Sequence, residues 1–324
     1  VFRVPPSPPA LPPPAPPPPP QPPSPPPTPP FLPHPPSLPP MSQPPPPPLP
    51  GAPPRVWFTT LNTGFGPGRW LFTGAATAPN GLVVFAPRHW SDRNPPSVGL
   101  FDPATNAFST IDISQSISGT HLYQGATTAS NGLVIFTPSN ADEIGILDPI
   151  SRIFSTKYIA GKVGIDEKFA GSGAPTSDGH VIFAPRQASG LGMFNAVSRE
   201  FVVVDVHHIV SGNHKYCGAV TTDTAEVVFV PFNADSVGLF NPISSTFSIV
   251  DISATISQDG KYYDAVKVAS GLVVFGPYNA DSVGIFDPAS RLFSAIDIST
   301  TLSSGSKFHG AALASNGLVV FSPH

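Results

Sequence analysis

A single stretch, repeated along most of the chain, constrains the fold more than any other feature of the sequence. Its clearest copy spans residues 271–288 and reads GLVVFGPYNADSVGIFDP. The six copies are marked by Phe-x-Pro triplets that begin at Phe85, Phe136, Phe183, Phe229, Phe275 and Phe321. The steps between these residue numbers are 51, 47, 46, 46 and 46. A fixed period of this size is typical of a repeat protein in which each copy packs on the next.

Each complete repeat contains four short segments that have the composition of β-strands. The first, 262–269 in the fifth repeat, has glycine and alanine at its centre in most other copies, and an Asn-Gly or Asp-Gly pair typical of tight hairpins follows it in four of them. The second, such as 82–85, is apolar without alternation, which indicates that both faces are covered, and a proline ends it. The third, such as 283–286, is also apolar, and the fourth, such as 108–113, alternates and therefore buries one face.

Four strands in about 46 residues, repeated around an axis, predict an all-β fold, a β-propeller of four-stranded blades. The first strand would lie at the crowded axis, where small side chains fit, and the fourth at the periphery. A parallel β-solenoid is the alternative, but its coils are shorter and lack Asn-Gly hairpins. We expect about six blades, of which the last, 308–324, has only its first two strands. We also expect the protein to continue past His324, and seven blades in the full protein stay open.

Residues 1–54 differ from the rest, because they hold 32 of the 47 prolines and one charged residue, Arg3. Such a segment cannot bury enough apolar surface to become ordered, so we expect a disordered polyproline stalk or linker before a propeller over 55–324. Proline runs of this kind are ligands of SH3 and WW domains, which makes such domains one expected class of partner. Residues 58–61 align with 293–296 of a full repeat and predict one further outer strand for the sixth blade.

Composition excludes several classes of function. Charged residues make up 11% of the chain, against about 25% in typical soluble domains, and the net charge of −4 predicts no nucleic-acid partner. No apolar run approaches the roughly 18 residues of a membrane span. Cys217 is the only cysteine, which excludes an intramolecular disulfide and a cysteine-based zinc site. The sequence shows no signal peptide, but the stalk composition favours an extracellular or cell-wall location.

The order of small residues, Asn-Gly turn, apolar strand and VGIFDP-like strand is similar to that of NHL and streptogramin-lyase-like propellers. Residues 78–85 with 98–103, and 314–321, carry this resemblance best, and it spans 71–324. It implies a propeller fold, but it concerns turn and core residues, and no catalytic residue of the lyases has a counterpart here. The VVFxPxNADSVGxFDP pattern also resembles repeats of uncharacterised algal and protist proteins. The stalk resembles hydroxyproline-rich cell-wall glycoproteins.

Two sets of positions are candidates for a binding site. One position on the first strand varies, as expected at the mouth of a channel, or as drift would produce at a tolerant site: Thr73, Gln124, Ala170, Cys217, Tyr263 and His309. The other set recurs in the loop between the second and third strands: Asn140, Asp142, Asn233, Asp235, Asn279 and Asp281. These oxygens suit calcium or sugar hydroxyls, or they hydrogen-bond their own backbone in a tight turn. One Asp per loop is too few for calcium.

No residue set predicts a catalytic centre, a cofactor or a metal site. His207, His208 and His214 share one connector, and His121 is the counterpart of His214, but no helical spacing or carboxylate pair accompanies them. The sequence therefore favours a non-enzymatic binding or scaffolding propeller that takes a protein or carbohydrate ligand. One alternative is a lyase or hydrolase that uses His309, Tyr263 and Gln124 at the channel mouth. The other is an intracellular interaction module whose proline tract recruits SH3 or WW domains.

Overall fold

The computed structural model describes residues 71–89 and 95–324, and these residues form 22 β-strands and no helix. The predicted stalk, 1–54, and the predicted extra strand at 58–61 lie outside the described residues. Within the described ranges, no helix is long and apolar enough to cross a membrane. The strands form five four-stranded antiparallel sheets and one two-stranded sheet.

Each sheet follows chain order and forms one blade. Blade one contains β1 (Phe72–Thr77), β2 (Val83–Pro87), β3 (Ser97–Asp102) and β4 (Ala107–Asp112). Blade two contains β5 (Tyr123–Thr128), β6 (Val134–Pro138), β7 (Glu143–Asp148) and β8 (Ile153–Tyr158). Blade three contains β9 (Phe169–Pro175), β10 (His180–Pro185), β11 (Gly190–Asn195) and β12 (Phe201–Asp205). Blade four contains β13 (Tyr216–Thr221), β14 (Val227–Pro231), β15 (Ser236–Asn241) and β16 (Thr246–Asp251). Blade five contains β17 (Tyr262–Lys267), β18 (Val273–Pro277), β19 (Ser282–Asp287) and β20 (Leu292–Asp297), and blade six contains β21 (Phe308–Leu313) and β22 (Val319–Pro323).

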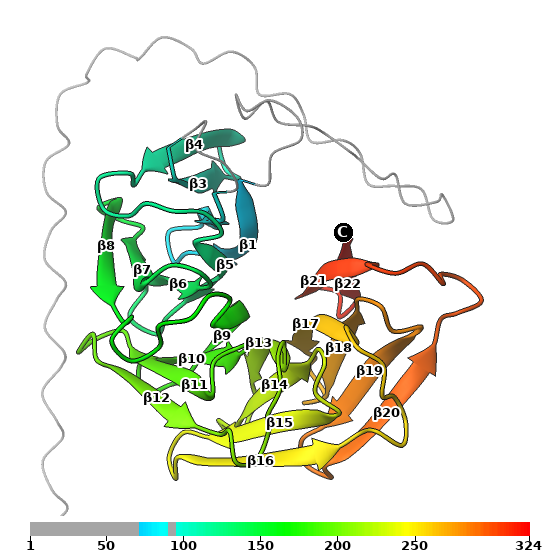
Figure 1. The fold of residues 1–324 in the computed structure, drawn as a ribbon. Coiled ribbons are helices and arrows are strands. Elements are labelled where there is room, and N and C mark those ends of the chain that lie inside the picture. The colour runs from blue at the N-terminus through cyan, green and yellow to red at the C-terminus, as the bar shows by residue number, and fades with distance from the viewer. Residues whose placement is uncertain (1–70, 90–94) are drawn as a thin grey trace, which may run out of the picture. The chain divides into compact units, whose positions relative to one another are not determined.

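The blades are arranged radially around one axis (Figure 1). The first strands, β1, β5, β9, β13, β17 and β21, lie on the inside, and each contacts the first strand of the next blade. The ribbon is open between β1 and β21 in this view. This arrangement confirms the propeller with five complete blades and a two-stranded sixth, and the solenoid alternative is wrong.

Backbone contact at the axis explains the small residues of the first strands. A Cβ atom placed on Gly125 of β5 would lie 2.2 Å from the carbonyl oxygen of Gly171 on β9. A Cβ atom on Gly171 would in turn lie 2.5 Å from the Cα of Gly218 on β13. No side chain fits between these backbones, so glycine is required at Gly125 and Gly171, where blades two, three and four meet.

A group of aromatic rings explains the Val-Gly-x-Phe motif of the third strand. In blade two the ring centroids of Tyr123 and Phe136 are 5.6 Å apart, and those of Phe136 and Phe154 are 6.1 Å apart. A Cβ atom on Gly145 of β7 would lie 2.9 Å from both the Phe136 and Tyr123 rings. Rings from the first, second and fourth strands therefore meet over a glycine of the third, and the aromatic and glycine positions of the repeat depend on each other.

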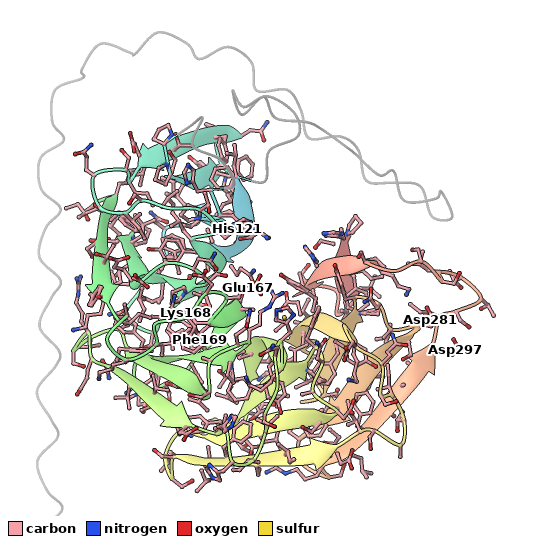
Figure 2. The ribbon with its side chains drawn as sticks, in the orientation of Figure 1. His121, Glu167, Lys168, Phe169, Asp281 and Asp297 are labelled. Atoms are coloured by element: carbon pink, nitrogen blue, oxygen red, sulfur yellow. The ribbon has the colours of Figure 1, made fainter. Side chains whose placement is uncertain are left out.

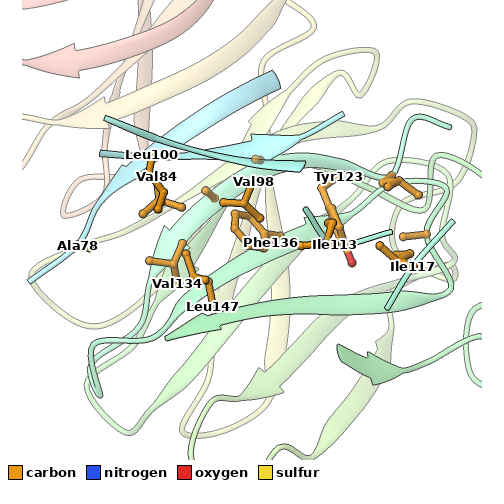
Figure 3. Close-up of a cluster of buried hydrophobic side chains, with 14 residues drawn as sticks. Ala78, Val84, Val98, Leu100, Ile113, Ile117, Tyr123, Val134, Phe136 and Leu147 are labelled. Atoms are coloured by element: carbon orange, nitrogen blue, oxygen red, sulfur yellow. The ribbon is translucent and has the colours of Figure 1, made fainter. Parts of the chain in front are cut away.

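The apolar core lies between blades rather than within one. Figure 3 shows Val84 and Val98 of blade one among Val134, Phe136 and Leu147 of blade two, and all five are fully buried. The continuous apolar strands β6, β10 and β14 are therefore covered on both faces, as the sequence predicts, whereas β22 of the two-stranded sixth blade is largely exposed. The fourth strands are more exposed than expected, because only two positions of β4 are even partly buried.

Candidate functional site

Two positions of the repeat meet at one end of the axis. In blade two Tyr123, which begins the first strand, pairs with Pro138, which ends the second. The residue after each Phe-x-Pro therefore lies beside the start of a first strand, at what we call the Phe-x-Pro end of the ring. The residues that follow the six prolines are Arg88, Ser139, Arg186, Phe232, Tyr278 and His324.

At this end, side chains from five blades form a group that we call the mouth cluster. Its members are Gln124, Glu167, Arg186, His214, Phe232, Tyr263, Tyr278 and His309. Figure 2 shows Glu167 on the inner side of the ring together with His121, whereas Asp281 and Asp297 lie on the outer side of blade five.

One half of the mouth cluster is charged and polar, and Arg186 lies at its centre. Arg186 Nη1 donates to Gln124 Oε1 at 3.2 Å, and its Nε lies 3.6 Å from Glu167 Oε2. The same carboxylate oxygen lies 2.8 Å from His214 Nε2 and accepts a hydrogen bond from Gln187 Nε2 at 3.1 Å. These contacts join blade two to the connectors that lead into blades three and four.

The environment of this half keeps Glu167 ionised. Burial acts to raise the pKa of the Glu167 carboxyl, but the charge of Arg186 and the hydrogen bonds from Gln187 and His214 outweigh it, so the pKa is lowered. The Cys217 thiol nearby shows the opposite result. Its burial raises the pKa to about 12 even though Arg186 acts against the shift, so Cys217 stays a thiol at neutral pH and is a poor nucleophile.

The other half of the mouth cluster is a set of packed aromatic rings. Tyr263 and His309 stack with centroids 4.1 Å apart, and Tyr278 stacks on His309 at 5.4 Å. Phe232 packs against Tyr278 at 5.6 Å, and the Arg186 guanidinium lies 5.7 Å from the Phe232 centroid. This last contact joins the two halves. The pKa of His309 is lowered to about 4 by burial and by the positive charges of His324, Arg88 and Arg186, so its ring is neutral at pH 7.

The structure places the channel-mouth candidates in three environments. Gln124, Tyr263 and His309 come together in the mouth cluster, and Cys217 is buried behind it. Thr73 lies apart from them on β1, where its hydroxyl donates to the Tyr123 carbonyl of the next blade at 3.0 Å. Their use by a ligand stays a prediction.

Sequence reasoning missed Arg186, Phe232 and Tyr278, although a signal was present. The residue after each Phe-x-Pro changes from repeat to repeat as freely as the first-strand position does. Glu167 and His214 occupy a second position that differs between repeats, two residues before the start of a first strand. Both have positive φ values, of 49° and 52°. Variation at these positions would have marked the same end of the ring.

The loop asparagines hydrogen-bond to the next blade. Asn140 Oδ1 accepts from the Glu167 backbone N–H at 3.0 Å, and Asn233 Oδ1 accepts from that of Gly260 at 2.9 Å. Asn279 Oδ1 accepts from the Ser306 N–H at 3.0 Å. The sequence analysis gave hydrogen bonds to the residues' own turn as the alternative to a ligand. The hydrogen bonds of these three asparagine oxygens link consecutive blades instead.

The loop aspartates pair with buried lysines that the sequence analysis did not single out. Asp235 Oδ1 lies 2.8 Å from Lys261 Nζ, and Asp281 Oδ1 lies 2.9 Å from Lys307 Nζ. The corresponding distance from Asp142 to Lys168 is 3.8 Å, and Lys168 Nζ also donates to three loop carbonyls of the preceding blade. We call this arrangement the lysine latch. It accounts for the Asn-Ala-Asp motif without a ligand, and calcium or sugar binding there stays a prediction.

Lys215 is the exception among these lysines. Its Nζ donates to the carbonyls of Arg186 and Gly212, at 3.3 and 3.0 Å, and Ser189 occupies the loop position where the other blades have an aspartate. Burial lowers the pKa of Lys215. The latch at this position therefore holds the backbone of Arg186, the central residue of the mouth cluster.

An open cavity of about 510 Å³ lies between blades one and six, and Thr73, Ser172, Asp264, Gly310 and Ser322 contribute to its lining. Asp264 occupies a position that is glycine in the other repeats. Burial raises the pKa of its carboxyl to about 6, although hydrogen bonds from the N–H groups of Ala311 and Ala265, at 3.1 and 2.9 Å, act against the shift. The cavity thus contains a carboxyl that titrates near neutral pH.

The histidines considered for a metal do not form a cluster. His207 and His208 are exposed, and His214 contacts Glu167 at the mouth. Across 71–89 and 95–324, no three His, Cys, Asp or Glu side chains are grouped so that they could hold a metal ion.

Comparison with solved structures identifies the fold. The chain is similar to a catalytically inactive variant of virginiamycin B lyase from Staphylococcus aureus, solved with quinupristin, with a TM-score of 0.61 and 14% identity over 76% of this chain and 75% of that one. A streptogramin B lyase structure gives a TM-score of 0.61 at 15% identity, over 77% and 75% of the two chains. The extracellular domain of a one-component system from B. thetaiotaomicron gives 0.56 at 12% identity, over 81% of this chain and 40% of that one. Neither a protein-family model nor a curated protein matches the sequence.

These likenesses and the described strands establish the fold: the chain is a β-propeller, similar in fold to the streptogramin B lyases. At 12–15% identity the likeness concerns the fold alone. The resemblance seen in the sequence is confirmed to that extent.

Proposed function

We propose that this propeller is a binding module whose protein or carbohydrate ligand occupies the mouth cluster. The observation that carries the proposal is the convergence of side chains from five blades at one end of the axis, each from a position that differs between repeats. The residue types of the repeat recur at the positions that pack between blades. At the Phe-x-Pro end they differ from one repeat to the next. Ligand sites usually combine apolar rings with a few fixed polar groups, and the two halves of the mouth cluster offer this combination.

Screening the full chain on a glycan array and a peptide array tests this proposal. Tyr278→Ala removes one ring of the mouth cluster, and Tyr158→Ala is the matched control, because Tyr158 lies on β8 and is 65% exposed. We expect at least one ligand whose binding falls tenfold or more in Tyr278→Ala and is unchanged in Tyr158→Ala. Ligands that bind both variants equally, or no ligand on either array, would contradict the proposal.

The second candidate is an enzyme, and the contact between Glu167 and His214 favours it. A carboxylate 2.8 Å from an imidazole nitrogen is a common way to orient a general base. The wild-type chain would then convert a ligand found by the arrays, and His214→Gln would abolish turnover and keep the binding. Recovery of every array ligand unchanged after long incubation with the wild type would exclude this function.

We propose further that residues 1–54 display the propeller as an extended spacer outside the cell. The support is their composition, with 32 prolines in 54 residues. Mass spectrometry of the natural protein should find hydroxyproline or arabinose on this segment. Unmodified prolines, together with capture of SH3 or WW domains by a peptide of this sequence, would support the intracellular alternative instead.

A further inference from the structure

The cavity between blades one and six contains one charged group. Asp264 is the only ionisable side chain among the described residues that line it, and the hydroxyls of the lining belong to Thr73, Ser172 and Ser322. Asp264 also departs from the pattern of the first strands, because the other five repeats have glycine at its position. The blade therefore forms without this carboxylate, and its presence in the cavity calls for a separate explanation.

The two neighbouring first strands do not cover the Asp264 carboxylate with a side chain. Their residues at this position are Gly218 and Gly310, and Cβ atoms placed there would lie 3.3 and 3.9 Å from the Asp264 oxygens. The N–H groups of Ala265 and Ala311 donate to the carboxylate, and they use two of the roughly four acceptor sites of such a group. Glycine on both sides thus leaves room for a ligand to reach the other acceptor sites.

No cation balances the charge of this carboxylate. Across residues 71–89 and 95–324, no lysine, arginine or histidine forms an ion pair with Asp264. Burial raises the pKa of its carboxyl to about 6, so the group is largely ionised at pH 7.5. An ionised carboxylate in a partly apolar cavity costs free energy, and a cation beside it would remove part of that cost.

Much of the remaining lining is apolar. Phe72 and Phe85 of blade one and Val320 of blade six contribute to it. Phe85 is partly exposed, whereas its counterparts in blades two to five are fully buried. Aromatic rings attract the positive charge of an ammonium group and pack against its carbon substituents. A bare metal ion would use none of this apolar surface, and a single carboxylate is too few for it.

We infer that this cavity is a second binding site, whose ligand is a small organic amine with an apolar body. The ammonium group would pair with Asp264, the hydroxyls of Ser172 and Ser322 would accept its other N–H groups, and the apolar body would lie against Phe85 and Val320. The cavity volume of about 510 Å³ lies within the usual range for small-molecule sites. None of the lining residues belongs to the mouth cluster, so this site goes beyond the proposed function.

Titrations of the full chain with matched amines and alcohols, followed by saturation-transfer-difference NMR at pH 7.5, test the inference. The pairs are phenethylamine and 2-phenylethanol, cyclohexylmethylamine and cyclohexylmethanol, and hexylamine and 1-hexanol. The members of each pair differ only in the group that would face Asp264. We expect at least one amine to bind about tenfold or more tightly than its alcohol. Equal affinity within every pair, or no binding of any amine, would overturn the inference.

Variants of Asp264 locate the bound amine. Asp264→Asn and Asp264→Gly should each weaken that amine about tenfold or more and leave the affinity for its alcohol unchanged. Glycine is the residue of the other five repeats, so Asp264→Gly decides the result if Asp264→Asn does not fold. Asp297→Asn is the matched control and should bind as the wild type does, because Asp297 lies on the outer side of blade five (Figure 2). Wild-type affinity for the amine in both Asp264 variants would contradict the inference.

Binding of the amine at the mouth cluster would give a different result. Tyr278→Ala should bind the amine as the wild type does. Loss of amine binding in Tyr278→Ala, together with unchanged binding in Asp264→Gly, would place the amine at the mouth cluster and overturn the inference. An array ligand that depends on Tyr278 should in turn bind Asp264→Gly normally, so failure of the inference and failure of the proposed function are distinguished.

Discussion

The inner and outer strands of one blade differ in burial and in role, as β5 and β8 of blade two show. β5 is buried along almost its whole length, its Gly125 meets the backbone of the next blade, and its Gln124 belongs to the mouth cluster. β8 contains no fully buried residue, and Ile153 and Tyr158 are each 65% exposed. The inner strand therefore carries both the packing between blades and the candidate site, whereas the outer strand completes a sheet.

This difference shows how one repeat places a packing position and a candidate binding position side by side. Along β5 the variable residue Gln124 directly precedes the constrained Gly125. A strand can vary at one residue and be fixed at the next, because alternate side chains point to opposite faces. The axis of the ring is thus the place where the repeat is both most regular and most variable.

The largest expected effect is a glycine substitution at the axis. Gly125→Ala places a methyl group 2.2 Å from a backbone oxygen that cannot move aside, and we expect a loss of about 4 kcal/mol or more in the free energy of unfolding. Gly161→Ala is the control, since no atom lies within 4 Å of its Cβ position, and it should stay within about 0.5 kcal/mol of the wild type. Urea unfolding of both variants measures the difference, and equal stability would mean that the inner strands do not pack as described.

The lysine latch should give the next largest effect. Lys261→Met removes the ion pair with Asp235 and the hydrogen bond to the Asn233 carbonyl, and we expect a loss of about 2–4 kcal/mol. Lys157→Met, on the outer strand β8, should cost less than about 0.5 kcal/mol. Thermal unfolding of the two variants makes the comparison, and a larger cost for Lys157→Met would reverse the assignment of inner and outer roles.

Asp264 gives the inner strand a pH dependence opposite in sign to that of the outer-strand aspartates Asp112, Asp251 and Asp297, whose pKa values are lowered by hydrogen bonds. Its folded pKa of about 6 lies above the usual unfolded value near 3.9, so folding takes up a proton between these values and stability falls as the pH rises through this range. Asp264→Asn should therefore be more stable than the wild type by about 1–2 kcal/mol at pH 7.5, after allowance for partial exposure, and nearly equal to it at pH 4. Urea unfolding at the two pH values measures this, and a gain that does not change with pH would show that the carboxyl is not perturbed.

The smallest expected effect lies at the periphery. Ile243 is 86% exposed in the turn between β15 and β16, so Ile243→Ser should change the free energy of unfolding by less than about 0.5 kcal/mol. Differential scanning calorimetry provides the measurement. A loss above about 1 kcal/mol would mean that the outer part of the blade is packed against something that the described residues do not include.

The sequence was sufficient to predict the blade, because its signals are local. The Asn-Gly pairs, the prolines after each second strand and the change from apolar to alternating strands all act within one repeat, and Gly81 and Gly132 take the positive φ that such turns need. The latch and the mouth cluster were not predicted, because they join different repeats. A lysine before Phe169, Tyr216, Tyr262 and Phe308 recurs in the sequence, but its partners lie in the preceding blade. Likewise, nothing in the spacing of Gln124 and Arg186 indicates that they touch.

Hydrogen–deuterium exchange of the full chain, with and without an array ligand whose binding depends on Tyr278, tests most directly whether the inner ends of the strands form the binding site. The account predicts slower exchange in the peptides that begin β5, β13 and β17 and in those that follow Pro185, Pro231 and Pro277, with β8, β16 and the Asn-Gly turns unchanged. Slower exchange at the outer strands or the turns, or no change anywhere in the chain, would contradict it.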